Sequence, residues 1–105
     1  MDEMKTAEYL NNLVETKWEV ITPEIAREML THNTNNYRAI SKTVVSRYVD
    51  EIQGNCWEAN GDTIVFNEDG VLLNGQHRLT AVAEAGKPIV SLVVRGIPDS
   101  QVFDI

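Results

Sequence analysis

The order of a strand, an Asn-Gly break and a helix within residues 71–82 constrains this chain more than any other feature. The segment reads Val-Leu-Leu-Asn-Gly-Gln-His-Arg-Leu-Thr-Ala-Val. Three apolar residues are typical of a short strand, Asn74-Gly75 interrupts it, and a helical pattern follows. The first turn of a helix leaves about four backbone N–H groups without intrahelical partners, and their partial positive charge attracts anions. The pattern therefore predicts a phosphate-bearing ligand at this turn.

The side chains of the same turn fit that interpretation. Gly75 lets a ligand approach the backbone, and Gln76, His77 and Arg78 follow in the first helical turn. Arginine suits phosphate because its planar guanidinium group binds two oxygens at once. Gly75, Gln76, His77 and Arg78 are therefore the candidate phosphate ligands. An Asn-Gly pair also forms ordinary turns, and short glycine motifs often match by chance, so spacing alone leaves both interpretations open.

The flanking segments predict an α+β fold. Residues 63–66 and 71–73 read as strands joined by the turn Asn67-Glu68-Asp69-Gly70, and residues 89–94 read as a further strand. Upstream, residues 5–15, 23–30 and 41–53 read as helices and residues 17–21 as a strand. We expect one domain, with a small mixed sheet and surrounding helices. Residues 1–16 form its N-terminal helix, residues 17–98 its core, and residues 99–105 begin a C-terminal helix.

The apolar positions of these helices predict their buried faces. At helical spacing, the candidate core residues are Tyr9, Leu10, Leu13, Val14, Ile25, Met29, Leu30, Val45, Tyr48, Val49 and Ile52. Cys56 is the only cysteine, so the chain forms no internal disulfide, which suits a reducing cytoplasm. We expect Cys56 to be a small buried packing residue rather than a nucleophile.

The motif around residue 75 resembles a known family. The residues from Leu72 to Ala81, followed by Ala-Gly-Lys-Pro at 85–88, are similar to the phosphate-binding box of the ParB/sulfiredoxin superfamily. Within it, they resemble the phage and bacterial DGQHR-type proteins, described as ParB-like nuclease domains. The ParB box Gly-x-x-Arg-x-x-Ala is matched by Gly75, Arg78 and Ala81. The resemblance covers residues 18–98 and is sharpest over 62–97.

Two departures limit what the resemblance implies. Sulfiredoxins carry Gly-Cys-His-Arg, and here Gln76 stands in place of the reactive cysteine, so thiolate chemistry has no nucleophile at that position. Asn74 replaces the Asp that is more usual in the DGQHR subset. The resemblance therefore implies binding of a nucleoside triphosphate or a nucleic-acid phosphate, with Mg²⁺ accompanying the nucleotide. It leaves nucleotide hydrolase and nuclease activity open, and it points to a phage or mobile-element origin.

A second group of ligand contacts is predicted before the third helix. In ParB-like families a polar segment ending in Arg precedes the helix that faces the nucleotide, and Asn36, Tyr37 and Arg38 are similar in order. Tyr37 could stack on a base, and Arg38 could bind a second phosphate. The alternative is a solvated loop in which Arg38 pairs with a nearby carboxylate. His32 is expected at the surface.

The acidic composition argues against unaided binding to duplex DNA. Sixteen acidic residues oppose nine basic ones, giving a net charge of −7, whereas proteins that bind DNA phosphates carry a basic face. A local basic patch remains available if Arg38, Lys42, Arg47, His77 and Arg78 converge. An alternative function follows from the same charge. A non-enzymatic interaction protein, such as a phage-encoded inhibitor, would cover a basic partner surface with Glu24, Glu28, Glu51 or Glu58.

Catalysis has one candidate residue. His77 can act as a general acid or base near neutral pH, but it can equally donate a hydrogen bond to phosphate. A metal-dependent nuclease would need converging carboxylates, yet Glu68 and Asp69 are the residues that turn chemistry alone would select. The sequence holds no zinc-type ligand spacing, and we expect no protein-bound metal.

The remaining expectations concern location and assembly. The acidic N-terminus does not follow the plan of a signal peptide, and no apolar stretch approaches the roughly 18 residues of a membrane span. We therefore expect a cytoplasmic protein without membrane contact. Val102, Phe103 and Ile105 leave an apolar end that favours a protein partner or a homo-oligomer.

Overall fold

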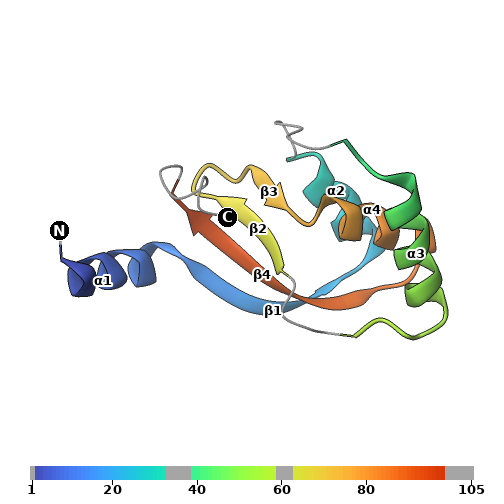
Figure 1. Ribbon diagram of the computed structural model, residues 1–105, viewed down its shortest axis with the longest axis horizontal. Helices are drawn as coiled ribbons and strands as arrows, with labels where there is room; N and C mark the ends of the chain where they lie inside the picture. Colours follow the sequence, from blue (N-terminus) through green and yellow to red (C-terminus); the bar gives the residue numbers. More distant parts are fainter. Residues whose placement is uncertain (1, 33–38, 59–62, 99–105) are drawn as a thin grey trace.

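The chain folds into a mixed α+β domain, seen here in a computed structural model that describes residues 2–32, 39–58 and 63–98 (Figure 1). In these ranges the sheet has the order β1-β4-β2-β3, with β4 antiparallel to β1 and parallel to β2, and β3 antiparallel to β2. The elements are α1 (Glu3–Leu13), β1 (Glu15–Ile21), α2 (Pro23–Leu30), α3 (Lys42–Gln53), β2 (Thr63–Asn67), β3 (Leu72–Asn74), α4 (Gln76–Ala85) and β4 (Ile89–Ile97). The predicted α+β class and mixed sheet are confirmed, whereas residues 99–105 lie outside the described ranges.

Capping side chains explain where three of the helices begin. The Asp2 carboxylate accepts a hydrogen bond from the Lys5 amide at 2.9 Å, and the Thr22 hydroxyl accepts one from the Ile25 amide at 3.1 Å. The Ser41 hydroxyl does the same for Val44 at 3.3 Å. Each cap satisfies a backbone N–H that the first helical turn leaves unpaired. These local signals are legible in the sequence, which is why the predicted helix starts are close to the observed ones.

A buried asparagine builds the turn between β2 and β3. The Asn67 side-chain oxygen accepts hydrogen bonds from the amides of Asp69 and Val71, each at 2.9 Å. The Gly70 amide donates to the Asn67 carbonyl at 3.0 Å, and Gly70 has a positive φ of 81°. Glu68 and Asp69 therefore sit at exposed turn positions, as turn chemistry predicts.

The sheet has one face covered by helices, which we call the inner face. Successive strand residues point to opposite faces, and Ile21, Ile64, Ile89 and Val93 share the inner one. These four residues are at most 5% exposed. They join helical side chains in one core cluster, whose helical members are Ala26, Met29, Val45, Ile52, Leu79, Ala81 and Val82. The helices that supply them, α2, α3 and α4, gather at the end of the molecule opposite α1 (Figure 1).

The opposite side of the sheet, which we call the outer face, is also apolar. Trp18 and Val20 of β1 lie beside Leu92 and Val90 of β4, and Val94 continues the row. Trp18 is 55% exposed and Val20 57% exposed. The core cluster includes none of these five residues. The expectation of helices surrounding the sheet is therefore corrected, because the helices that build the core pack on the inner face.

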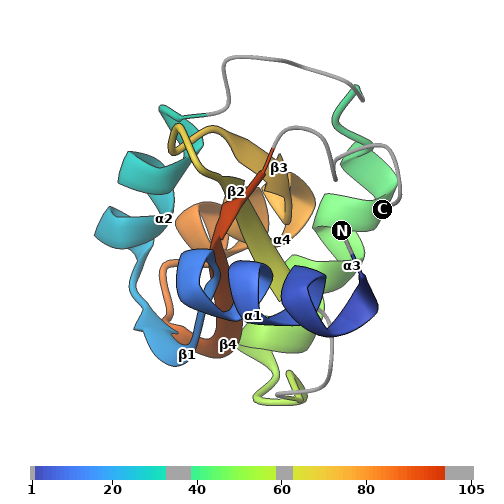
Figure 2. The same ribbon diagram turned by 90° about the vertical axis from the view of Figure 1, so that its left-hand side faces the viewer.

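Helix α1 extends beyond the sheet instead of packing into the core. None of its residues is buried, and its C-terminal end lies against Gly96 of β4, where an added Cβ would meet the Leu13 carbonyl. The rest of the helix points away from the sheet (Figures 1 and 2). The expectation that Tyr9, Leu10 and Leu13 form a buried stripe within this chain is wrong. The amphipathic pattern correctly predicts a helix, but it does not say which surface covers the apolar side.

Two further burial predictions need correction. Ile25 is 39% exposed, and Ala26 takes its place in the core because α2 presents the positions of Ala26 and Met29 to α4 and the sheet. Cys56 is exposed rather than buried, with its thiol 3.4 Å from the Gly54 carbonyl. Val45 and Ile52 are buried as predicted, and Tyr48, Val49 and Leu30 pack partly buried against the cluster.

Candidate phosphate site at the start of helix α4

Gly75 makes the connection between β3 and α4. It is the N-cap of α4, with φ of 104° in the left-handed region that glycine adopts without strain. A Cβ added there would lie 3.0 Å from Cγ1 and 3.2 Å from Cα of Ile64 in β2. The Asn74 side-chain oxygen accepts a hydrogen bond from the Gly75 amide at 3.0 Å. The chain thus requires glycine here for its own packing, independently of any ligand.

His77 connects the first turns of two helices. Its Nε2 atom accepts a hydrogen bond from the Ser41 backbone amide at 2.9 Å, and Ser41 is the N-cap of α3. A backbone N–H can only donate, so Nε2 carries no proton and the neutral ring holds its proton on Nδ1. The N-termini of α3 and α4 are therefore joined through one side chain. Both helix dipoles place their positive ends in this region.

This tautomer bears on the role of His77. A general base must offer an unprotonated ring nitrogen to the reacting group, and the Nε2 lone pair is already engaged by Ser41. The Nδ1–H group is a donor, and a donor can bind a phosphate oxygen. Of the two roles that the sequence leaves open, the geometry favours hydrogen bonding to an anion.

Arg78 is turned into the body of the protein. It is 8% exposed, and its Nη1 donates a hydrogen bond to the Thr63 carbonyl at 3.1 Å. Its guanidinium carbon lies 5.8 Å from the centre of the Trp57 ring, within cation–π range. Arg78 therefore attaches α4 to the first residue of β2 and to the segment after α3. Its positive charge remains in the first turn of α4.

The four predicted ligands thus diverge from one another. Gln76 and His77 are half-buried, His77 reaches α3, and Arg78 reaches β2. The Gln76 carbonyl accepts a hydrogen bond from the Thr80 hydroxyl at 2.7 Å, one turn further along the helix. Sequence reasoning missed the Ser41 amide and the Asn74 side chain as parts of this region. Asn74 adjoins the motif, whereas nothing local in the sequence connects Ser41 to residue 77.

The second predicted contact group cannot be placed. Asn36, Tyr37 and Arg38 lie outside the described residues. Of the proposed basic patch, Lys42 is exposed at the first residue of α3, next to the cap that His77 contacts. Arg47 lies further along α3, with its guanidinium carbon 5.4 Å from the ring centre of Tyr48. Arg78 thus lies in the first turn of α4, and Lys42 follows the Ser41 cap that His77 contacts.

The part of the chain that the structure describes contains no preformed cluster of metal-ligating side chains. No group of three or more His, Cys, Asp or Glu side chains lies close enough there to hold a metal ion. His32 is exposed at the end of α2 and pairs with Glu28 at 3.0 Å. Glu24 pairs with Arg27 at 3.6 Å on the same helix. These carboxylates form local surface ion pairs, which contribute little to stability.

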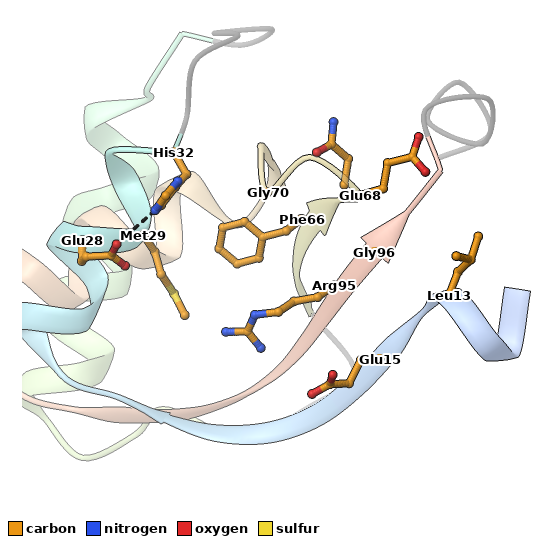
Figure 3. Close-up of a pocket in the computed structure, with 11 residues that line it drawn as sticks. Leu13, Glu15, Glu28, Met29, His32, Phe66, Glu68, Gly70, Arg95 and Gly96 are labelled. Carbon is orange, nitrogen blue, oxygen red and sulfur yellow. Dashed lines mark hydrogen bonds and ion pairs between the residues drawn. The ribbon is translucent and has the colours of Figure 1, made fainter.

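A groove of about 430 Å³ opens between α2 and the sheet (Figure 3). Phe66 and Arg95 extend from the strands toward Met29 on α2, and this groove was not predicted from the sequence. Its lining mixes these side chains with three carboxylates and a histidine, from Glu15, Glu28, Glu68 and His32. The groove is large enough for a small molecule. Its excess of carboxylates disfavours an anionic ligand.

The one cation on the strands of this groove is already paired. Arg95 donates two hydrogen bonds to the Glu19 carboxylate, one of them from Nη2 to Oε1 at 3.1 Å. The hydrogen bond to Glu19, and then the negative charges of Glu19 and Glu15, raise the pKa of Arg95 above its ordinary value, against the effect of burial. The guanidinium also lies 5.6 Å from the Phe66 ring centre. Phosphate binding is therefore better supported at α4 than in this groove.

Comparison with known proteins gives no relative from which to assign a role. No protein-family model, no curated protein and no solved structure matches the chain. No helix within the described ranges is both long and apolar enough to cross a membrane.

Proposed function

We propose that this chain is a phosphate-binding domain of the ParB/sulfiredoxin-like type, which binds a nucleoside triphosphate or a nucleic-acid phosphate at the start of α4. The observation that carries the proposal is the junction of two helix N-termini, made by the hydrogen bond from the Ser41 amide to His77. Each N-terminus contributes partial positive charge and backbone N–H donors. The sequence Gly75-Gln76-His77-Arg78, which resembles the family's phosphate box, supports the same location.

Each residue at the junction has a distinct part in this proposal. Gly75 supplies the left-handed turn from which α4 begins. His77 donates from Nδ1 to a phosphate oxygen. Lys42 is exposed at the start of α3 and supplies a mobile cation. Arg78 holds α4 against β2 through the Thr63 carbonyl and adds its positive charge to the first turn of α4. Mg²⁺ would enter with the nucleotide and would offset part of the phosphate charge, because Mg²⁺ commonly binds through substrate phosphates.

The geometry supports binding more strongly than hydrolysis. Nε2 of His77 is engaged by Ser41, so this ring offers no free base without losing that bond. Glu68 and Asp69 occupy the β2–β3 turn, where the Asn67 side chain organises the backbone. A nucleotide-binding domain with slow or absent turnover is therefore the proposed activity, and a phage or mobile-element origin remains part of the proposal. Cytoplasmic location is proposed with it.

Calorimetric titration with CTP, ATP and GTP, each with Mg²⁺, tests the proposal. The variant is Gln76→Glu, which places a carboxylate in the first turn of α4. A negative charge there is favourable to the helix dipole but repels phosphate, so the protein should stay folded while binding weakens at least about tenfold. Fluorescence anisotropy with labelled single-stranded and duplex oligonucleotides, at two salt concentrations, covers the nucleic-acid form of the ligand.

Gln53→Glu is the matched control. Gln53 is the last residue of α3, and its side-chain amide donates to the Ala85 carbonyl at the C-terminal end of α4 at 3.5 Å. The variant therefore makes the same exchange of Gln for Glu away from the start of α4. Binding unchanged in Gln53→Glu and lost in Gln76→Glu would establish the site. If the folded wild-type protein binds none of these ligands, the proposal is wrong. The acidic surface, including Glu24, Glu28, Glu51 and Glu58, would then become the leading candidate for function.

A further inference from the structure

Within the residues that the structure describes, helix α1 packs little against the rest of the chain. Its eleven residues include none that is buried, and Tyr9 is 50% exposed. Isolated helices shorter than about 12–15 residues are marginal in water, because tertiary packing of the apolar side supplies most helix stability in proteins. On α1 that side consists of Thr6, Tyr9, Leu10 and Leu13 at spacings of three and four. A stable α1 therefore requires a surface that covers this stripe.

The outer face of the sheet supplies the complementary surface. Trp18, Val20 and Val90 are all 45% or more exposed and lie side by side on β1 and β4. Leu92 and Val94 are half-buried in the same row. Strands that are apolar on both faces are typical of sheets covered on both sides. An exposed apolar row of this kind marks an interaction surface.

We propose that a second copy of this chain covers the outer face, with α1 of each copy packed on the sheet of the other. The occupant is assigned as α1 because one chain carries both uncovered parts, an apolar helix stripe and an apolar sheet face. A two-fold exchange covers both parts in both copies and closes the assembly. The contact residues are uncharged on both sides, so the dimer is held by apolar burial.

The proposal is independent of the phosphate site. The start of α4 lies on the helical part of the molecule, away from α1 (Figure 1). The net charge of −7 on each copy makes the two chains repel, and added salt screens that repulsion. The dimer should therefore hold or tighten in salt, whereas a complex between an acidic chain and a basic partner would weaken.

Analytical ultracentrifugation of the full chain over a wide concentration range tests the dimer. Tyr9→Glu and Met4→Glu form a matched pair, because both add a carboxylate to an exposed position of α1 on opposite sides. We expect Tyr9→Glu to weaken the dimer by at least about tenfold and Met4→Glu to leave it unchanged, since apolar anchors dominate interface energies. Circular dichroism confirms that each variant remains folded. A chain that is monomeric at every concentration, or equal effects of the two variants, would overturn the proposal.

Disulfide trapping between two differently labelled chains tests the geometry. In a Cys56→Ser background, one chain carries Leu10→Cys and the other carries Val20→Cys. A mixed disulfide dimer, lost when Asn11→Cys replaces Leu10→Cys, is the expected result. Asn11 lies next to Leu10 on the polar side of α1. Efficient trapping of two Leu10→Cys chains to each other, without the mixed product, would mean that α1 packs on α1 and would overturn the proposal.

Discussion

The two faces of β4 carry similar residues in different surroundings. Ile89, Ser91 and Val93 point to the inner face and are at most 5% exposed, whereas Val90 on the outer face is 45% exposed. β4 therefore carries apolar residues that could be buried on both faces, yet the core helices cover only its inner face. The difference shows that apolar periodicity reports what a strand can bury, and that the packing partner decides what it does bury.

The largest expected effect is on the helical side of the inner face. Leu79 of α4 is fully buried in the core cluster, so Leu79→Ala leaves a cavity that the surrounding side chains cannot close. We expect a loss of about 3 kcal/mol in the free energy of unfolding, measured by urea denaturation. Glu84→Ala, at an exposed position of the same helix, should change it by less than about 0.5 kcal/mol. Similar losses in the two variants would contradict the assignment of the inner face as the core.

Substituting the two glycines that flank α4 distinguishes the cost of a positive φ from the cost of a steric clash. Gly86→Ala, where a Cβ meets no atom within 4 Å, should cost about 1 kcal/mol for its positive φ alone. Gly75→Ala should cost about 2–3 kcal/mol, since the added Cβ also presses on Ile64 of the inner face. Thermal unfolding of both variants measures the difference. Equal losses of stability in the two variants would show that Ile64 can make room for a Cβ at residue 75.

The same substitution on opposite faces of β4 gives the most direct comparison. Val93→Ala removes two buried methyl groups and should cost about 2 kcal/mol. Val90→Ala should cost less than about 0.5 kcal/mol when unfolding is followed at a concentration too low for self-association. Raising the protein concentration should selectively stabilise the wild type over Val90→Ala, because partner binding adds stability by mass action.

The smallest expected effect on monomer stability concerns Trp18. Trp18→Thr keeps a residue that favours strands and removes a largely exposed ring, so the dilute monomer should change by less than about 0.5 kcal/mol. The dimer should weaken by about tenfold or more, because large aromatic residues dominate interface energies. A large loss of stability in the dilute monomer would indicate that Trp18 is covered within its own chain.

Much of the fold was predictable because its signals are local. Thr22 and Ser41 cap helices within three residues, Asn67 organises its own turn, and Gly86 ends α4 with a left-handed conformation. Each signal acts over a few bonds and needs no knowledge of the rest of the chain. Ile25 shows where local reasoning fails, because its position on α2 is apolar but Ala26 and Met29 face the core.

The candidate site was only partly predictable. The sequence alone locates a helix start with Gly75, Gln76, His77 and Arg78, because strand and helix periods change at this point. It does not indicate that His77 reaches the Ser41 amide 36 residues away, or that Arg78 turns toward Thr63 and Trp57. Those contacts depend on how α3 and β2 pack beside α4. The Arg95–Glu19 pair, 76 residues apart, likewise depends on the register of β1 against β4.

The sequence by itself thus determined the helices, the strands and the chemistry available at the start of α4, since capping, turns and periodicity act locally. The tertiary structure decided which tautomer His77 holds, that Arg78 is an internal anchor, and which face of β4 is covered. The physical reason is that burial and hydrogen-bond partners come from segments far apart in the chain. An apolar strand residue is the same in sequence whether a helix, a second copy or water lies above it.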